Sequence, residues 1–508
     1  MIESCIHEVK QMEYFFLNEK EKKKYNLFKT ILKNEMIEMR DIKVHLDISS
    51  TSVRRCLLEI NEELSEVFPE SNISICFFRT GYSLVDNKLQ NSFLLDSMKL
   101  FYIKKSNEFI ILNILISKRY TSVNQLSLQI NISPSHLYKY IKSIRVFLSQ
   151  YKLDLTFSAD AMTNTSLMGT EIHKLYFLSI YYWDIYKTIK FPPFLPDNSS
   201  LYQTDTLSSF QEKRIQQLLS VTKHPAIKIN KKKIDPNLKD ICEIFSKFNH
   251  NLISSEEAAP SEFIISPLEN FFIRLFIPEF DSDLSKLRIS QLAAQLDNNE
   301  IVILSTTFLD TLFETYSVEP NEFQYNVCLY HSLVIHIFLK YVNVDFFNTL
   351  ESAPRLSGLS TKELSFFDLE ADLLQFYKKL TTNNEHYQLH ISEVNFVYMV
   401  NFSYFLIDYC TDTKKVYICV ELTQNNFSTQ MINKNLIAIF GNDNIELTNS
   451  QMQADIILTD FYQEGMDIEK IYHFDNPYCN DSWTNVLSFI TTILYKKSVL
   501  SLNFQPRI

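Results

Sequence analysis

Six lysine and arginine side chains lie in one stretch of the sequence that contains no acidic residue. The stretch runs from 109 to 152, and its cations are Lys118, Arg119, Lys139, Lys142, Arg145 and Lys152. Residues 1–160 carry 22 Lys and Arg against 19 Asp and Glu, although the whole chain has a net charge of −11. A basic region on an acidic protein indicates a polyanionic partner for that end of the chain. A solvated lysine face is the alternative that charge alone leaves open.

The apolar residues of this stretch predict two amphipathic helices joined by a tight turn. Leu126 and Ile130 are four residues apart, and the second apolar stripe runs through 137–148. Between the stripes, Asn131 tolerates a left-handed backbone, and Ser133 is a suitable cap for the next helix. Such a helix-turn-helix lets its second helix enter the major groove of DNA while the first braces it.

The same arrangement occurs a second time, 84 residues earlier. The apolar pattern of 42–64 repeats that of 126–148 without a gap, and a preceding helix repeats as well. Each copy is followed by a predicted β-hairpin, which turns near Gly81 in the first and ends near Gly169 in the second. The sequence therefore predicts two copies of a winged helix-turn-helix unit.

The candidate DNA contacts are the residues that point away from the apolar stripe of each second helix, together with the tip of the first hairpin. Cations at these positions suit phosphates and guanine edges, and hydroxyls suit the DNA backbone. For His136 and Tyr138, packing inside the protein is an equal alternative. The candidates are Ser50, Thr51, Ser52, Arg54, Arg55 and Arg79 in the first unit, and Ser135, His136, Tyr138, Lys139, Lys142 and Arg145 in the second.

The composition excludes several classes of protein. With 508 residues, of which 46% are apolar, the chain can form several domains, but its 5 glycines leave no room for a glycine-rich nucleotide loop. The 8 cysteines lack the spacing of a metal site and are expected to be reduced, mostly buried thiols. We expect no cofactor, no metal and no catalytic site. Neither a secretion signal nor a membrane span is evident, so we expect a cytoplasmic protein.

The order of these parts resembles the Mga/AtxA family of virulence-type transcriptional regulators. After the second winged unit, the segment "GTEIHKLYFLSIYYWDIYKTIKFPPF" carries the resemblance through Gly169, Glu171, Tyr182, Trp183, Pro193 and Phe194. The resemblance implies a mainly α multidomain fold. It consists of winged helix-turn-helix domains at 1–90 and 91–171, all-α phosphotransferase-system regulation domains (PRDs) at 172–290 and 291–408, and an α/β EIIB-like dimerisation domain at 409–508.

The resemblance also implies control by histidine phosphorylation, with a phosphotransferase-system phosphocarrier protein as a possible partner. His331 stands where a regulatory histidine is expected, and His336 follows it; ordinary helical packing is the alternative for both. In the first regulatory domain the candidates are His173, His224 and His250, with His224 in a segment expected to be an exposed loop.

The last hundred residues predict a small parallel α/β domain, because strand-like and helix-like segments alternate there. In an active EIIB component a cysteine accepts the phosphoryl group at a strand end. Cys419 instead lies in mid-strand and is followed by no glycine, which favours an interaction module over a phosphocarrier.

These observations predict a non-enzymatic, homodimeric regulator that binds double-stranded DNA and does not enter a membrane. The alternatives are a PRD-containing RNA-binding antiterminator, a non-catalytic helical scaffold and an active phosphotransfer component.

Overall fold

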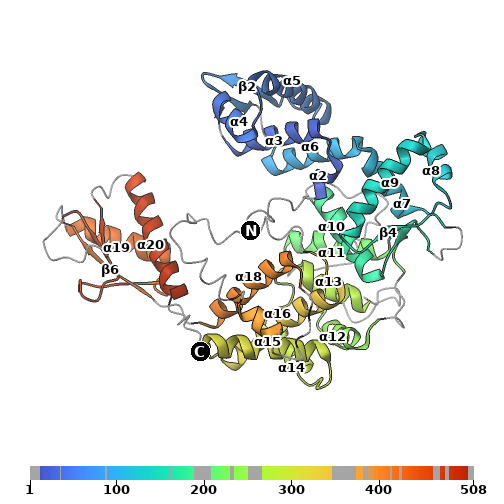
Figure 1. The fold of residues 1–508 in the computed structure, drawn as a ribbon. Helices are drawn as coiled ribbons and strands as arrows, with labels where there is room; N and C mark the ends of the chain where they lie inside the picture. Colours follow the sequence, from blue (N-terminus) through green and yellow to red (C-terminus); the bar gives the residue numbers. More distant parts are fainter. Residues whose placement is uncertain are drawn as a thin grey trace, which may run out of the picture. The chain divides into compact units, whose positions relative to one another are not determined.

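The computed structural model describes most of the chain, and Figure 1 shows its fold. The described residues are mainly helical, as predicted, with a small parallel sheet in the C-terminal region. They form two compact bodies, one from 1–285 with 334–348 and the other from 286–333 with 349–508. The structure describes residues 12–34, 36–85, 89–158, 163–187, 207–228, 234–249, 266–345, 373, 375–381, 387, 389, 391–411, 415–422, 426–461, 470–474 and 480–500.

The first N-terminal unit has the helix order and the hairpin that the sequence predicts. It consists of α3 (Glu19–Lys33), β1 (Ile37–Glu38), α4 (Met39–Leu46), α5 (Ser50–Val67), β2 (Ser74–Phe78) and β3 (Gly81–Val85). The apolar stripe forms its core, where Ile42, Val53 and Ile60 are fully buried. Phe78 pairs with Gly81 across a two-residue turn, and β1 pairs with β3 on its other side. The turn therefore comes just before Gly81.

The second unit repeats this arrangement 84 residues later. It consists of α7 (Asn107–Ser117), α8 (Val123–Ile130), α9 (Pro134–Ser149), β4 (Asp154–Leu155) and β5 (Leu167–Met168). At this offset α8 has the same bounds as α4, and α9 begins at the position of Ser50. The turn repeats too, because Asp47 and Asn131 both adopt the left-handed backbone, with φ of 49° and 54°. Asp and Asn tolerate this conformation better than most residues, which explains where each first helix ends.

The wing of the second unit is shorter than that of the first. Its strands β4 and β5 pair over only two residues. Gly169 follows β5 directly with φ of +145°, and a Cβ there would lie 2.3 Å from Leu153 Cδ2. The backbone angle and the close approach both require glycine at this position.

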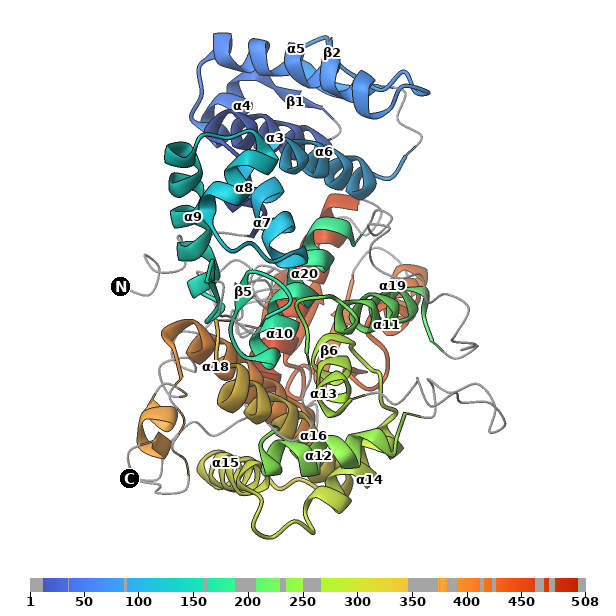
Figure 2. The same cartoon turned by 90° about the vertical axis from the view of Figure 1, so that its right-hand side faces the viewer.

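Three helices, α2 (Met12–Phe16), α6 (Asn91–Lys105) and α10 (Glu171–Tyr186), join the two units within the first body (Figure 1). Figure 2 shows α6 and α10 from a second side. Helix α6 packs against α3, α5, α7 and α10. Its Tyr102 hydroxyl donates a 2.6 Å hydrogen bond to Glu63 of α5. From α2, Phe16 lies edge-on to Phe109 and Tyr181. The first unit is therefore tied to α6 by a hydrogen bond, and the second unit to α2 by an aromatic contact.

The other described helices of the first body enclose buried charge. Its elements are α11 (Ser209–Thr222), α12 (Pro236–Ser246), α13 (Pro267–Phe276) and the π-helix η4 (Phe338–Val342). Arg274 and Asp281 form an ion pair of 2.7 Å whose side chains are 0% and 1% exposed. Arg274 also donates to the carbonyl oxygen of Phe245, so this pair ties α13 to the end of α12.

The second body contains a helical part and the parallel sheet. Its helical elements are α14 (Asp283–Ala293), which begins at its boundary, α15 (Glu300–Tyr316), α16 (Glu322–Ile337), whose last residues belong to the first body, and α18 (Glu393–Cys410). Phe308 of α15 stacks on Tyr377, Tyr387 and Phe402. This aromatic cluster forms the centre of the helical part.

The C-terminal region is the predicted parallel α/β arrangement. Its elements are β6 (Val416–Glu421), α19 (Asn426–Phe440), β7 (Ile445–Leu447), β8 (Ile456–Thr459), β9 (Ile471–His473) and α20 (Asn480–Leu500), with the strands in the order β7-β6-β8-β9. Strand β7 is not predicted from the sequence. Ile432 and Leu436 of α19 and Val486 and Ile490 of α20 share one core with the sheet, so both helices cover the same face.

Candidate DNA-binding surfaces

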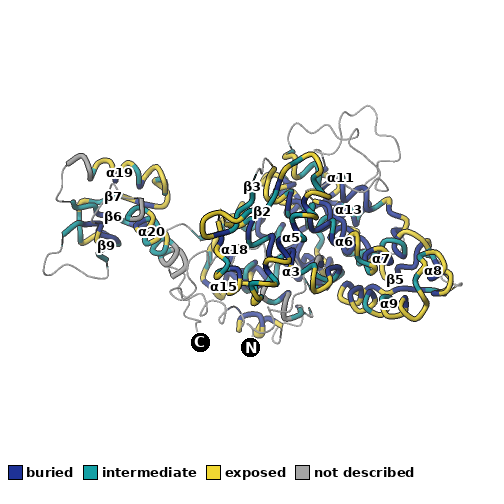
Figure 3. Tube along the Cα trace, turned by 90° about the horizontal axis from the view of Figure 1, so that it is seen from above, coloured by how far each residue is buried: buried dark blue, intermediate teal, exposed yellow. Residues whose placement is uncertain are grey.

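The outer face of α9 presents the predicted residues of the second unit to solvent. Ser135, His136, Lys139 and Lys142 are exposed, and Tyr138 is 57% exposed. The alternative of internal packing for His136 and Tyr138 is therefore wrong. Along α9 the exposed positions alternate with buried ones (Figure 3). Among the described residues, none forms a hydrogen bond or ion pair with Lys139 or Lys142, so both ammonium groups are available to a ligand.

Local chemistry holds α9 in this position. Ser122 caps α8 by accepting a hydrogen bond from the backbone N–H of Gln125. Ser127, within α8, is buried. Its hydroxyl donates a 2.6 Å hydrogen bond to the carbonyl oxygen of Ile132, which lies in the turn between α8 and α9. Pro134 then starts α9 with a backbone angle that suits a first helical turn. The angle between the two helices is thus set by the turn residues and by the small buried side chain at 127.

Two arginines of the basic stretch contact the wing. Arg145 donates a 2.8 Å hydrogen bond to the carbonyl oxygen of Leu155 in β4, and its Nε lies 3.3 Å from Asp154. Arg119 donates to the carbonyl oxygen of Ser158 at 2.9 Å. The structure therefore places Arg145, a predicted DNA contact, where it fixes the hairpin relative to α9.

The first unit concentrates positive charge at the N-terminal end of α5. Thr51, Arg54 and Arg55 are exposed, whereas Ser50 and Ser52 are half-buried. The first acidic residue of α5 is Glu59, which forms an ion pair of 2.8 Å with Lys20. The helix dipole also makes this end positive. In both units, the end of the second helix next to the turn is consequently the end suited to a phosphate backbone.

The tip of the first wing carries residues that the sequence analysis missed. Arg79 lies in the two-residue turn with φ of 51° and is exposed, as the prediction requires. Beside it, Phe77 is 58% and Phe78 is 48% exposed. The signal was present in the sequence "FFRTG", because two aromatic residues directly before a turn cannot both point into a small core.

A comparison with known protein families identifies part of this region. Residues 91–182 match the family model of the Mga helix-turn-helix domain. This part of the chain is therefore similar to Mga helix-turn-helix domains. The matched residues include α6, the whole second unit and most of α10, and the first unit precedes them in the chain. Among curated proteins, none matches the chain.

The predicted phosphorylation candidates lie in very different surroundings. His331 is half-buried, with its ring edge-on to Phe405 at 5.6 Å, whereas His336 is completely buried. His224 is only 3% exposed, so the expectation of an exposed loop around it is wrong. Ala226 and Ile227, which follow it, are apolar and also buried, so the segment packs inside the protein. His250 lies outside the described residues.

Hydrogen bonds fix the protonation of His224. Its Nδ1 accepts from the backbone N–H of Ala226 at 3.2 Å, so the ring hydrogen is on Nε2, which faces the Tyr182 hydroxyl at 3.2 Å. Burial lowers the pKa of His224 from 6.5 to about 4. The ring is therefore neutral near pH 7.

His173 is held at both ring nitrogens. Its Nε2 lies 2.8 Å from the carbonyl oxygen of Val342, and its Nδ1 lies 2.7 Å from the Thr170 hydroxyl. Because a carbonyl can only accept, Nε2 carries the ring hydrogen. Burial lowers the pKa of His173, although the bond to Val342 opposes this shift. Modification of either nitrogen would break one of these bonds.

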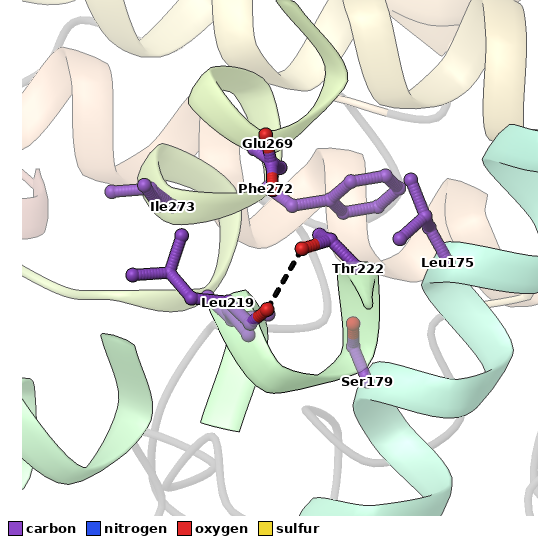
Figure 4. Close-up of a pocket in the computed structure, with 8 residues that line it drawn as sticks. Leu175, Ser179, Leu219, Thr222, Glu269, Phe272 and Ile273 are labelled. Atoms are coloured by element: carbon purple, nitrogen blue, oxygen red, sulfur yellow. Dashed lines mark hydrogen bonds between the residues drawn. The ribbon is translucent and has the colours of Figure 1, made fainter. Parts of the chain in front are cut away.

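A small pocket between α10, α11 and α13 offers no clear ligand site (Figure 4). Leucine, isoleucine and phenylalanine side chains form most of its lining. The Thr222 hydroxyl in it donates to the Leu219 carbonyl oxygen at 2.8 Å, and Glu269 accepts from the backbone of Ser266 in a capping box. Within the part of the chain that the structure describes, no group of three or more potential metal ligands occurs. None of the described helices is both long and apolar enough to cross a bilayer.

Proposed function

We propose that this chain is a cytoplasmic, non-enzymatic transcriptional regulator of the Mga/AtxA type that binds double-stranded DNA through both helix-turn-helix units. The observation that carries the proposal is the exposed, acid-free outer face of α9, on which no described residue pairs with Lys139 or Lys142, inside a region similar to Mga helix-turn-helix domains. The gapless structural repeat supports a second DNA-binding helix-turn-helix, formed by α4 and α5. The short first helix, turn and second helix match the geometry that places a recognition helix in the major groove.

Equilibrium binding of the purified full chain to duplex DNA over a salt series tests this proposal. Binding should weaken steeply as salt rises, because phosphate contacts release counterions. A single-stranded RNA of the same length is the matched control and should bind more weakly. Preference for the RNA would contradict the proposal and favour the antiterminator alternative.

We propose further that residues 172–290 and 291–408 form PRD-like domains controlled by histidine phosphorylation. Among the candidates that the structure describes, we select His331 as the acceptor, since His224 and His336 are buried and His173 is hydrogen-bonded at both nitrogens. A phosphoryl group adds close to two negative charges, and such a charge between α16 and α18 would alter their packing. Phosphoryl transfer from a phosphotransferase-system phosphocarrier, followed by mass spectrometry of the peptides, tests this. Loss of the modification in His331→Ala is expected, and unchanged modification would contradict the assignment.

We also propose that residues 409–508 form an EIIB-like module that holds two chains together. The support is the four-stranded parallel sheet and the apolar residues that α19 leaves on its outer surface, where Ile439 is 53% and Met431 is 39% exposed. Burial raises the pKa of the Cys419 thiol to about 11, which suits a structural rather than a phosphoryl-accepting cysteine. Sedimentation of the full chain should give a dimer that Ile439→Asp weakens. A wild-type monomer at micromolar concentration would contradict this proposal.

A further inference from the structure

Two cysteines far apart in the sequence have their sulfur atoms in contact in the second body. Cys328 lies in the second turn of α16, and Cys410 is the last residue of α18. Their Sγ atoms are 3.4 Å apart. Among the cysteines that the structure describes, no other pair has this contact. Figure 1 shows the two helices in the helical part of the second body.

The geometry of this pair suits a disulfide. A disulfide bond is about 2.05 Å long, so the two sulfur atoms would have to approach by roughly 1.4 Å from their 3.4 Å separation. Cys410 stands at the end of its helix, and Thr411 after it has left the helical conformation. A side chain at such a position can shift without disturbing helical turns on both sides. Cys328 is completely buried, whereas Cys410 retains 7% exposure.

The two thiols also differ in reactivity. Either thiol can donate its hydrogen to the other across this contact. The contact with Cys328 holds the pKa of the Cys410 thiol below its ordinary value. The same contact, together with burial, raises the pKa of Cys328. Cys410 also stands at the end of its helix and keeps 7% exposure, whereas Cys328 is completely buried, so a peroxide reaches Cys410 first. Since the thiolate is the attacking species, we assign the attack to Cys410, and Cys328 is placed to resolve the product.

We propose that Cys328 and Cys410 form an oxidative modification site that hydroperoxides convert to a disulfide. The Cys410 thiolate attacks the O–O bond of hydrogen peroxide, which forms an S–O bond and releases hydroxide. The resulting sulfenic acid is attacked by the Cys328 sulfur, which forms the S–S bond and releases the sulfenic oxygen as water. In sum, two thiols lose two electrons and two protons, and one hydrogen peroxide is reduced to two waters.

The disulfide would link the two helices that enclose His331. His331 follows Cys328 by one helical turn, and its ring packs on Phe405 of α18. Oxidation would therefore restrain the α16–α18 pair in its present arrangement. The modification itself depends neither on DNA binding nor on histidine phosphorylation, so its failure would leave both of those proposals standing.

Peptide mapping of the native full chain tests the proposal. The reduced protein is freed of reductant, treated with a small excess of hydrogen peroxide, alkylated and digested without reductant. We expect a linked peptide pair containing Cys328 and Cys410, lighter by two hydrogens than the sum of the separate peptides, which dithiothreitol separates again. Linkage of other cysteines first, or stepwise oxidation of Cys410 to sulfinic acid without linkage, would overturn the proposal.

Variants make the assignment specific. Cys328→Ser and Cys410→Ser should each abolish the linked pair, and only Cys328→Ser should leave a trappable sulfenic acid on Cys410. Cys419→Ser removes a buried thiol from β6 and is the matched control, which should keep the linkage.

If a serine variant fails to fold, wild-type protein unfolded in urea and treated with peroxide is compared with the folded wild type instead. Because the contact exists only in the folded chain, the unfolded protein should lose the preference for this pair, and an unchanged preference would overturn the proposal.

Discussion

Replacing Lys139 and Lys142 by alanine should reduce the salt dependence of DNA binding by the amount expected for two phosphate contacts. Both lysines lie on the exposed face of α9, one turn apart, and no described residue competes for their charge. Each phosphate contact contributes about 0.9 to the slope of log K against log salt concentration. The slope should therefore become shallower by about 1.8 in the double variant.

The difference in slope between the wild type and the double variant corresponds to a difference in DNA affinity lost on adding salt. Between about 50 and 200 mM salt, the wild-type protein should lose about tenfold more affinity than the double variant. Fluorescence anisotropy with a labelled duplex measures both slopes directly. The matched control is Lys239→Ala with Lys247→Ala, which removes the same charge from the exposed face of α12 and its end. Its slope should remain close to that of the wild type.

An unchanged slope in the α9 variant would refute the reasoning. Equal reductions in both double variants would refute it as well, because net charge rather than the recognition helix would then explain binding. Circular dichroism of each variant should match the wild type, since the four replaced side chains are on the surface.

Four further predictions follow from individual residues. If the first unit binds DNA in the same way, replacing both Arg54 and Arg55 by alanine should make the slope of log K against log salt concentration shallower by about 1.8. The same anisotropy experiment measures it, and a slope equal to that of the wild type would limit DNA binding to the second unit. Asn131→Gly should leave stability nearly unchanged, whereas Asn131→Val should cost about 1–2 kcal/mol at its positive φ, seen as faster hydrogen exchange in α8 and α9. Gly169→Ala should destabilise the second wing by about 1–3 kcal/mol, because the new methyl group would meet Leu153, and thermal melting would show the loss. Burial lowers the pKa of His224 from 6.5 to about 4, so on acidification the unfolded chain takes up a proton before the folded chain does. The free energy of unfolding should therefore be at its full value above pH 6.5 and fall by up to about 3 kcal/mol toward pH 4. Urea unfolding measures this loss, and His224→Gln should lack it.

Local signals predict the N-terminal units well. The turn at Asn131 is set by neighbours in the sequence, and the repeat at an offset of 84 residues supplies an independent check. Ser133 takes the predicted position before α9, but its side chain forms no capping hydrogen bond. The C-terminal strands are also local, since β6 and β8 are short apolar runs. Strand β7 escapes prediction because its three residues, 445–447, are too few to show a period and form a strand by pairing with β6.

Long-range contacts explain what the sequence could not predict. Nothing near Arg145 in the sequence indicates that it contacts the wing rather than remaining free, because its acceptor is a backbone carbonyl. The burial of His224 depends on α10, which supplies Tyr182. The contact between Cys328 and Cys410 joins residues 82 apart, and no spacing rule relates them.

The most direct test of the central claim is to map where duplex DNA touches the full chain. Ultraviolet crosslinking of the bound duplex, followed by mass spectrometry of the crosslinked peptides, locates the contacts without any substitution. The structure predicts crosslinks in α9 around Tyr138, in the N-terminal half of α5, and at the first wing near Phe78. Crosslinks confined to the helices after α10 or to the C-terminal sheet would contradict the assignment of the helix-turn-helix units as the DNA-binding surface.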